Sequence, residues 1–212
     1  ERRCTGDLTV NGNFYIGTTN YDDLYVGGNV NLNAGGLLQL GGWNAGVAGD
    51  LFLAGHWYHN GGTFDANERA IWFNGSAGDQ TVNYSGTEIF GYFIIQKASG
   101  NVVMNCDAEI RGGNSGYPLQ LLNGNWDLKG RTVTFYMYYD GTLHDISIAG
   151  GGTRQVISSS GTGTLYFKHE DATQRISTIA SSASTLLSFS SGVIVAIGTP
   201  AGFANGGVDF GS

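Results

Sequence analysis

Four phrases of one form occur between Gly6 and Gly55, and they restrict the possible fold more than any other feature. They read GDLTVNG (6–12), DDLYVGG (22–28), GLLQLGG (36–42) and GDLFLAG (49–55). Each has apolar residues in alternation followed by glycine or asparagine, the pattern of a short strand that ends in a turn. The central leucines recur at short, similar intervals: Leu8, Leu24, Leu38 and Leu51. A unit this short buries its apolar face only by stacking on the next copy, as in a solenoid.

The rest of the chain also favours strands over helices. No window has a sustained apolar period of 3.6 residues with helix caps. The 36 glycines and only two prolines among 212 residues indicate tight turns in an ordered chain rather than collagen. We therefore expect an all-β fold: a β-solenoid resembling a parallel β-helix, with about ten short coils spaced by ~4.8 Å in a single elongated domain. A pair of β-sandwiches is the alternative, but it leaves the repeats unexplained.

Longer repeats divide the chain further. AIWFNGSAGDQTVNYSGT (70–87) matches DISIAGGGTRQVISSSGT (145–162) without a gap, with apolar positions over apolar positions. GHWYHNGGTF (55–64) matches GNWDLKGRTV (124–133) in the same way. Within one domain, 1–212, these repeats predict short-repeat coils at 1–54, a best-matched repeat unit at 55–136 and a degenerate second unit at 137–212.

His56 and His59 are the most suggestive candidates for a metal or catalytic site. In the second copy of their repeat, Asn125 and Leu128 take their places, so the repeat does not need histidine. Residues three apart on a strand also point to opposite faces. We therefore predict structural roles for both histidines and no metal site. The neighbouring aromatic residues are expected to be buried in ladders between coils: Trp57, Trp72 and Trp126.

The two cysteines, Cys4 and Cys106, leave alternatives open. A disulfide within the chain would close a long loop. A bond between chains is a second arrangement, because Cys4 lies in an N-terminal segment that could reach a neighbour. Two unpaired, buried thiols are the third.

Composition excludes some partners. The formal net charge is −7, the sequence pI is about 4.8 and no basic patch occurs, so nucleic-acid binding is not expected. The longest apolar run, roughly Val193 to Ile197, is too short to span a bilayer, so no membrane insertion is expected. The start at Glu1 predicts a processed or recombinant N-terminus. Together with scarce lysine and frequent Asn, Ser and Thr, this favours an extracellular protein.

An enzyme is not predicted, although parallel β-helices can carry glycan lyases and hydrolases. Such enzymes need carboxylates that converge on one face. The charged candidates are Asp22–Asp23, Glu68–Arg69 and the run Lys168-His169-Glu170-Asp171. Adjacent strand residues face opposite ways, so these pairs make poor acid–base couples. We predict no catalytic residue, no cofactor and no metal ligand, and the run at 168–171 is the most enzyme-like place.

Residues 60–113 resemble the repeats of large secreted surface proteins of Bacteroidota and related bacteria. The shared phrases are Gly55-x-Trp57, Thr63-Phe64, Phe73-Asn74-Gly75, Gln80-Thr81-Val82 and Lys97-x-Ser99-Gly100. The resemblance covers residues 50–136 well and 140–200 loosely. It implies an extracellular β-solenoid that serves as an adhesin, fibre or coat component, with no catalytic residues to carry over.

Both ends of a solenoid expose unpaired backbone groups, and no capping segment is evident in the sequence. We therefore expect either a longer array or head-to-tail docking of copies, which gives an open filament, with strand donation as a variant. The predicted function is a non-enzymatic structural subunit of a cell-surface filament or coat, whose partners are copies of itself. The alternative is a carbohydrate-binding adhesin in which aromatic rings stack on glycans: Trp43, Trp57 or Tyr58.

Overall fold

A computed structural model describes residues 1–16, 22–41, 49–112, 118–137, 146–148, 155–169, 177–181, 187–198 and 208–209. These residues form strands and contain no helix. Every pairing between the named strands is parallel, and the one antiparallel contact among them is an isolated bridge between Asn33 and Gly61. The described part of the chain has no helix long and apolar enough to cross a membrane.

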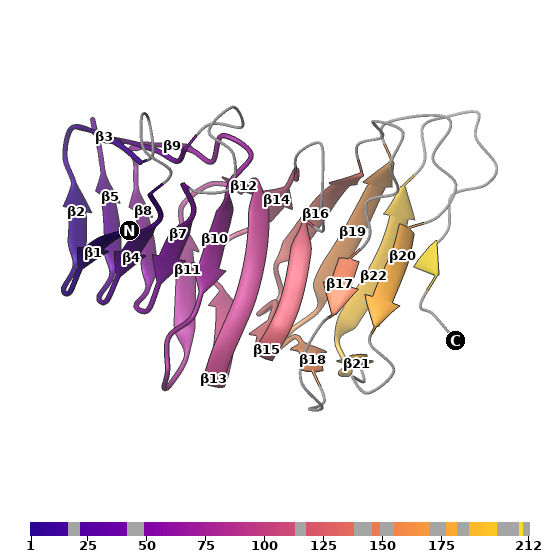
Figure 1. The fold of residues 1–212 in the computed structure, drawn as a ribbon. Helices are drawn as coiled ribbons and strands as arrows, with labels where there is room; N and C mark the ends of the chain where they lie inside the picture. Colours follow the sequence, from indigo (N-terminus) through magenta and orange to yellow (C-terminus); the bar gives the residue numbers. More distant parts are fainter. Residues whose placement is uncertain are drawn as a thin grey trace.

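The strands lie on three faces, which the chain visits in turn before it returns to the first face (Figure 1). The first face contains β1 Arg2–Cys4, β4 Leu24–Val26, β7 Leu51–Leu53, β10 Ala70–Phe73, β17 Ile146–Ile148, β20 Ser177–Ser181 and β23 Val208–Asp209. The second contains β2 Leu8–Val10, β5 Val30–Asn33, β8 Trp57–Asn60, β11 Gln80–Tyr84, β18 Gln155–Ser158 and β21 Leu187–Phe189. The third contains β3 Asn13–Tyr15, β6 Leu37–Gln39, β9 Thr63–Asp65, β12 Glu88–Phe90, β14 Ala108–Ile110, β16 Thr132–Met137, β19 Gly163–His169 and β22 Val193–Gly198.

Two long strands join the first face to the second. β13 (Tyr92–Met104) and β15 (Leu119–Asp127) each continue around the corner, so both faces belong to one 15-stranded sheet. Their register shifts between Ile95 and Gln96 and again between Gln96 and Asn101, which is where the paired strands turn.

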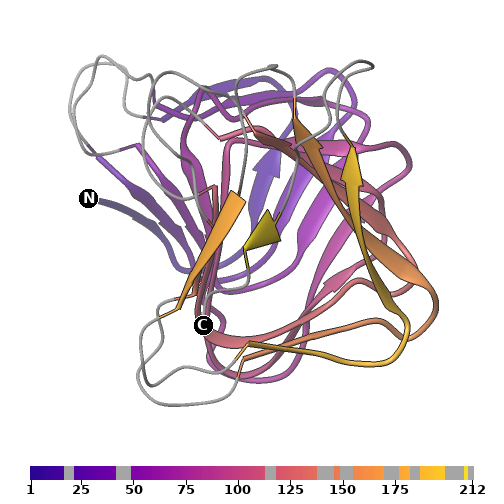
Figure 2. The ribbon, with the colours of Figure 1, turned by 90° about the vertical axis from the view of Figure 1, so that its right-hand side faces the viewer.

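Each return to the first face advances the chain by one strand spacing, about 4.8 Å. Arg2 pairs with Leu24, and Leu24 pairs with Leu51, so the length of chain in a circuit varies from one circuit to the next. Figure 2 looks along the stack and shows the circuits superposed around a common centre. The described strands make eight circuits and begin a ninth, against about ten expected.

The short N-terminal phrases prove to be single strands rather than whole coils. Leu8, Leu24 and Leu38 lie on the second, first and third faces, and Leu8 pairs with Val30 of the next circuit. The expectation that each phrase stacks on the following one is therefore wrong, because three strands complete a circuit. The longer repeat at 70–87 and 145–162 has a direct structural meaning: Ile71 of β10 and Ile146 of β17 occupy the first face, three circuits apart.

Alternate strand residues point into the space between the faces and form one core. In β4 and β7 the first and third residues point inward and are buried, and the second residue is half-buried. Aliphatic side chains fill the first circuits, and large rings fill the later ones: Trp57, Phe73, Phe90, Phe93, Trp126, Phe135 and Phe167. Burial of this apolar surface is the main stabilising term.

Glycines at the corner between the first two faces allow the circuits to approach closely. Gly28 N–H donates to Gly6 O at 3.0 Å, and Gly55 N–H donates to Gly28 O at 3.0 Å. A Cβ on Gly55 would lie 2.3 Å from Gly28 O and 2.7 Å from Asn29 N. Backbone atoms cannot yield easily, so this column excludes side chains.

We predict that Gly55→Ala destabilises the protein by about 1–3 kcal/mol, the usual result of overpacking. Gly12→Ala is the matched control, because a Cβ there meets nothing within 4 Å, and its effect should stay within about 0.5 kcal/mol. Chemical denaturation followed by tryptophan fluorescence measures both. Equal stability of the two variants would refute the close approach at this corner.

Candidate functional site: the open first circuit

The strands of the first circuit lie at the end of the stack. β1 and β2 are the ends of the 15-stranded sheet, and β3 is the end of the three-stranded sheet. Leu8 N–H donates to Asn29 O at 2.8 Å, so Leu8 bonds to the second circuit. Successive residues of a parallel strand bond to opposite sides, so the N–H and C=O of Thr9 point away from the stack. The described residues supply no partner on that side.

The same edge also has an apolar cross-section. Cys4, Leu8 and Phe14 pack against the core but are only partly buried, whereas Val10 and Ile16 are buried. The open circuit therefore combines unpaired backbone groups with incompletely covered apolar side chains. A surface with both features is one that a further circuit of strands would cover.

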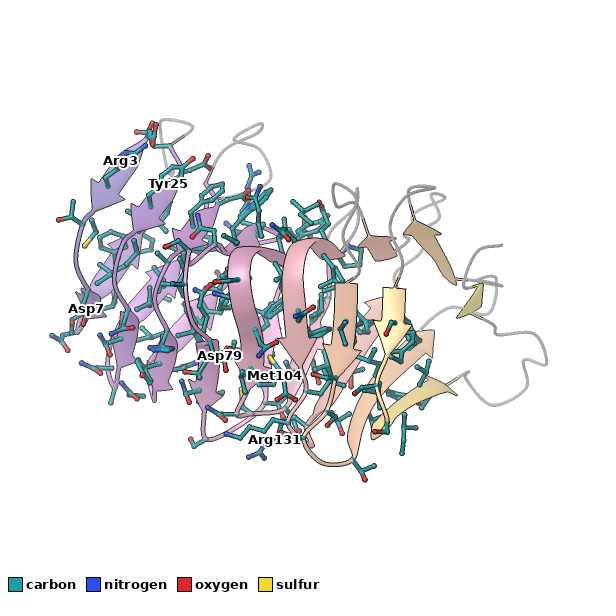
Figure 3. All side chains as sticks on the ribbon, turned by 90° about the horizontal axis from the view of Figure 1, so that it is seen from below. Arg3, Asp7, Tyr25, Asp79, Met104 and Arg131 are labelled. Atoms are coloured by element: carbon teal, nitrogen blue, oxygen red, sulfur yellow. The ribbon has the colours of Figure 1, made fainter. Side chains whose placement is uncertain are left out.

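A row of side chains gives the stack a direction. Asp7 Oδ1 accepts from Asn29 N–H at 2.7 Å, Asn29 Oδ1 accepts from His56 N–H at 2.8 Å, and His56 Nδ1 accepts from Thr81 N–H at 3.0 Å. In each contact, a side chain of one circuit satisfies the backbone of the next. Asp7 lies at the open end of this row (Figure 3), and its own backbone N–H has no such acceptor among the described residues.

A second row has the same direction. Asn33 Nδ2 donates to Asn11 Oδ1 at 2.8 Å, and Asn60 Nδ2 donates to Asn33 Oδ1 at 3.1 Å. At the open circuit, the Asn11 Nδ2 group therefore has no preceding circuit among the described residues to which it could donate. Both rows present donors at this end, so the rows of two such ends do not complement each other, whereas rows of acceptors would.

Three of the charged candidates from the sequence make structural contacts: Asp22, Asp23 and Arg69. The Glu1 amino group contacts Asp22 Oδ1 at 2.6 Å, and this hydrogen bond holds the pKa of Asp22 below its usual value. Asp23 Oδ1 accepts from the N–H groups of Gly49 and Asp50 at 2.9 and 3.0 Å. The two carboxylates thus do not form an acid–base couple. In the other pair, Arg69 Nε donates to Gly41 O at 3.2 Å.

Three aromatic rings form a ladder on the outer side of the first face. The ring centroids of Tyr25 and Phe52 are 4.4 Å apart, and those of Phe52 and Trp72 are 5.0 Å apart, with nearly parallel planes. The Arg3 guanidinium covers the end of the ladder, 5.1 Å from the Tyr25 centroid, and the two lie next to each other in Figure 3. The ladder flanks an apolar groove of about 320 Å³. The faces of the Tyr25 and Phe52 rings are thus covered, so a sugar has no access to them.

Trp57 does not fit the glycan-stacking prediction. It is 0% exposed, and its ring packs edge-on against Phe64 with centroids 4.8 Å apart. A buried indole offers no face to a sugar. Tyr58 points outward, is half-buried and lies 5.8 Å from the His56 ring. Trp43 lies outside the described residues. Of the other tryptophans in the predicted ladder, Trp126 is buried in the core and Trp72 stands in the outer row.

His56 and His59 lie on opposite sides of the second face, as strand geometry predicts. His56 belongs to the outer row, whereas the His59 side chain is only 5% exposed and contacts the equally buried Glu88. His59 Nδ1 lies 2.8 Å from Glu88 Oε2, and His59 Nε2 lies 2.8 Å from Gly62 O. The two imidazoles do not converge, and the described residues contain no group of three metal-binding side chains.

A second buried polar group lies at the corner of β13. Lys97 is 0% exposed, and its Nζ donates to Gly75 O at 3.2 Å and to Gln80 Oε1 at 3.1 Å. Gln80 Nε2 donates in turn to the carbonyls of Leu53 and Gly55, at 2.9 and 2.7 Å. Burial lowers the pKa of Lys97, and the negative charge of Asp79 raises it by a smaller amount. These side chains satisfy backbone carbonyls where the strands turn, so their role is structural.

Sequence reasoning missed Glu88, Gln80 and Lys97. Charged residues are usually exposed, and each of these stands in an ordinary polar-looking phrase. One signal could have found all three, because each shares the inward side of its strand with a core residue. Gln80 is two residues before Val82, Glu88 is two residues before Phe90, and Lys97 is two residues after Ile95.

Both thiols are free. Cys4 belongs to the first circuit and Cys106 to the fifth, about four strand spacings or roughly 19 Å apart along the stack, whereas a disulfide needs Cα atoms within about 7 Å. A disulfide within the chain is therefore excluded in this structure. Burial, followed by the charge of Glu88, raises the pKa of the Cys106 thiol to about 12. A thiol in that state is a poor nucleophile and a poor partner for another chain.

The charged run at 168–171 is only partly described. Lys168 Nζ lies 4.5 Å from the centroid of the Tyr136 ring, and Arg111 lies over the same ring at 5.1 Å. Arg111 is also paired with Glu109 at 2.7 Å. Residues 170 and 171 and the side chain of His169 lie outside the described part.

Comparisons of the chain with protein-family models, curated proteins and solved structures find no match. The resemblance to secreted surface repeats therefore stays a prediction, and the functional argument rests on the geometry of this chain.

We predict that a maleimide reagent at pH 7.5 labels the native protein at Cys4 and not at Cys106. Cys4 is partly exposed, whereas Cys106 is 2% exposed and its thiol stays protonated. Mass spectrometry of the labelled protein gives the sites, and unfolding in guanidinium should expose both. Rapid native labelling of Cys106 would contradict the described core.

Proposed function

We propose that the chain is a β-solenoid whose copies stack end to end as non-enzymatic subunits of an extracellular filament or surface coat. The observation that supports this most strongly is the open first circuit, with unpaired backbone groups, an apolar cross-section and two directional rows of donors. Parallel pairing of strands with those one circuit later, on all three faces and interrupted only between β9 and β12 among the described strands, favours a solenoid over a pair of sandwiches.

The direction of the rows supports head-to-tail stacking. Asp7 N–H and the Asn11 amide need acceptors, and the side-chain acceptors of Asp7 and Asn11 in a second copy would face that copy's own second circuit. A contact between two different ends is heterologous, and it leads to an open filament when the rotation does not close a ring. Backbone hydrogen bonds from an added strand would provide the affinity, as in other cases of strand addition.

The extracellular location is inferred from composition and from the resemblance to secreted repeats. The glycan-binding alternative loses Trp57, and no described aromatic residue gathers with others into an open platform for sugars. For the lyase or hydrolase alternative, the neighbouring carboxylates are Asp23 and Asp50, and both are occupied by hydrogen bonds from the backbone of the next circuit.

We predict that Thr9→Pro blocks assembly while leaving the fold intact. Proline removes the Thr9 N–H, which points away from the stack, and it spares the bond from Leu8 to Asn29. Proline is tolerated on an edge strand when its N–H side faces solvent. Thr9→Val is the control, because it keeps the N–H and suits a strand.

Negative-stain electron microscopy and sedimentation of the whole chain measure the outcome. Fibres of the wild type and of Thr9→Val, with dispersed short rods of Thr9→Pro, are the expected result. Dispersed rods of the wild type at high concentration would overturn self-assembly through this end.

A further inference from the structure

We propose that Glu88 and His59 share one buried proton that fastens the second face to the third, and that loss of this proton with rising pH loosens the third and fourth circuits. His59 belongs to β8 in the third circuit, and Glu88 belongs to β12 in the fourth. Their contact therefore bridges two faces and two circuits. This pH-responsive contact is independent of end-to-end stacking.

The proton count follows from the partners of the imidazole. Gly62 O only accepts hydrogen bonds, so His59 Nε2 at 2.8 Å must carry a hydrogen. Glu88 Oε2 lies 2.8 Å from His59 Nδ1. This short contact needs one more proton, held either by Nδ1 as imidazolium or by the carboxyl group. Without it, the neutral imidazole has one N–H for two acceptors, so either Gly62 O or the Glu88 carboxylate faces a ring lone pair.

Other neighbours strengthen the contact without supplying that proton. Trp57 Nε1 also donates to Glu88 Oε2, at 2.8 Å. The Tyr84 ring stacks on the imidazole, with centroids 3.9 Å apart and planes 6° from parallel, which favours a cation at that position. Two further ionisable groups thus face the pair, the Tyr84 phenol and the Cys106 thiol, and the Cys106 pKa is about 12.

The pH window follows from the direction of the His59 shift. Burial alone would lower the pKa of His59, but the hydrogen bonds to Glu88 and Gly62 and the Glu88 charge outweigh it, so the pKa lies above its ordinary value of 6.5. A raised pKa means that the folded state holds the proton more tightly than the unfolded state. The added stability is therefore complete below pH 6.5 and is lost as the pH rises through the folded-state pKa.

The contact links the turn after β8 to β12, so these two segments are the ones that loosen. Gly62 lies in the turn between β8 and β9, and Gly61 has a φ of 96°, so this turn depends on glycine. With the imidazole neutral and the carboxylate charged, that turn and β12 lose their link through the core. The Trp57 indole N–H would then exchange with solvent faster.

The test is a nuclear magnetic resonance titration of the wild-type chain from pH 5 to pH 9. We expect the His59 imidazole to titrate above 6.5, and the protection factor of the Trp57 indole N–H, which is its exchange rate relative to a free indole at the same pH, to fall at least tenfold across the same transition. A His59 pKa at or below 6.5 would overturn the proposal without any variant. A raised pKa with an unchanged protection factor of the indole would overturn the loosening.

Two variants test the partnership. Glu88→Gln keeps an oxygen for Trp57 but removes the charge, so His59 should titrate lower and the protection factor of the indole should lose its pH dependence. His59→Gln should abolish that dependence as well. Glu109→Gln, which changes a carboxylate on the outer face paired with Arg111, is the control and should behave as the wild type. An unchanged pH profile in folded Glu88→Gln would contradict the shared proton.

Discussion

The spacing of about 4.8 Å between hydrogen-bonded strands controls this structure. Paired strands of successive circuits lie at that distance, so each paired residue has a neighbour from the next circuit directly beside it. At the corner between the first two faces, backbones meet without room for a Cβ, and glycine is required at Gly28 and Gly55. At these two positions, glycine is therefore a consequence of stacking rather than of a loose loop.

The same spacing favours asparagine and aromatic side chains in the outer rows. Asparagine fits the outer rows because one amide both donates and accepts, as Asn33 does between Asn11 and Asn60. Flat rings fit because their thickness matches the gap, as in the ladder from Tyr25 to Trp72. A row continues for as long as circuits are added, so an uncovered end keeps unsatisfied groups. That property links the fold to the proposed assembly.

The all-β class and the opposite orientation of the two histidines could be predicted from alternation alone. The circuit length could not, because the phrases around Leu8, Leu24 and Leu38 look alike although they lie on different faces. Local pattern defines a strand, whereas its pairing partner depends on corners that the pattern does not encode. For the same reason, alternation carries no sign that Glu88 meets His59 and Trp57, since 29 and 31 residues separate these pairs along the chain.

The central claim is that successive circuits stack in register along one axis. Pulsed electron paramagnetic resonance tests it directly, with spin labels at Arg3 and Gln120 and with both native cysteines replaced by serine. These positions occupy one outer row, linked by the pairs Arg3–Tyr25, Tyr25–Phe52, Phe52–Trp72, Trp72–Ile94 and Ile94–Gln120. Five strand spacings predict a backbone separation of roughly 24 Å, broadened only by the labels. A narrow distribution near that value is the expected result, and a separation far from it, or several separate distances, would contradict the stack.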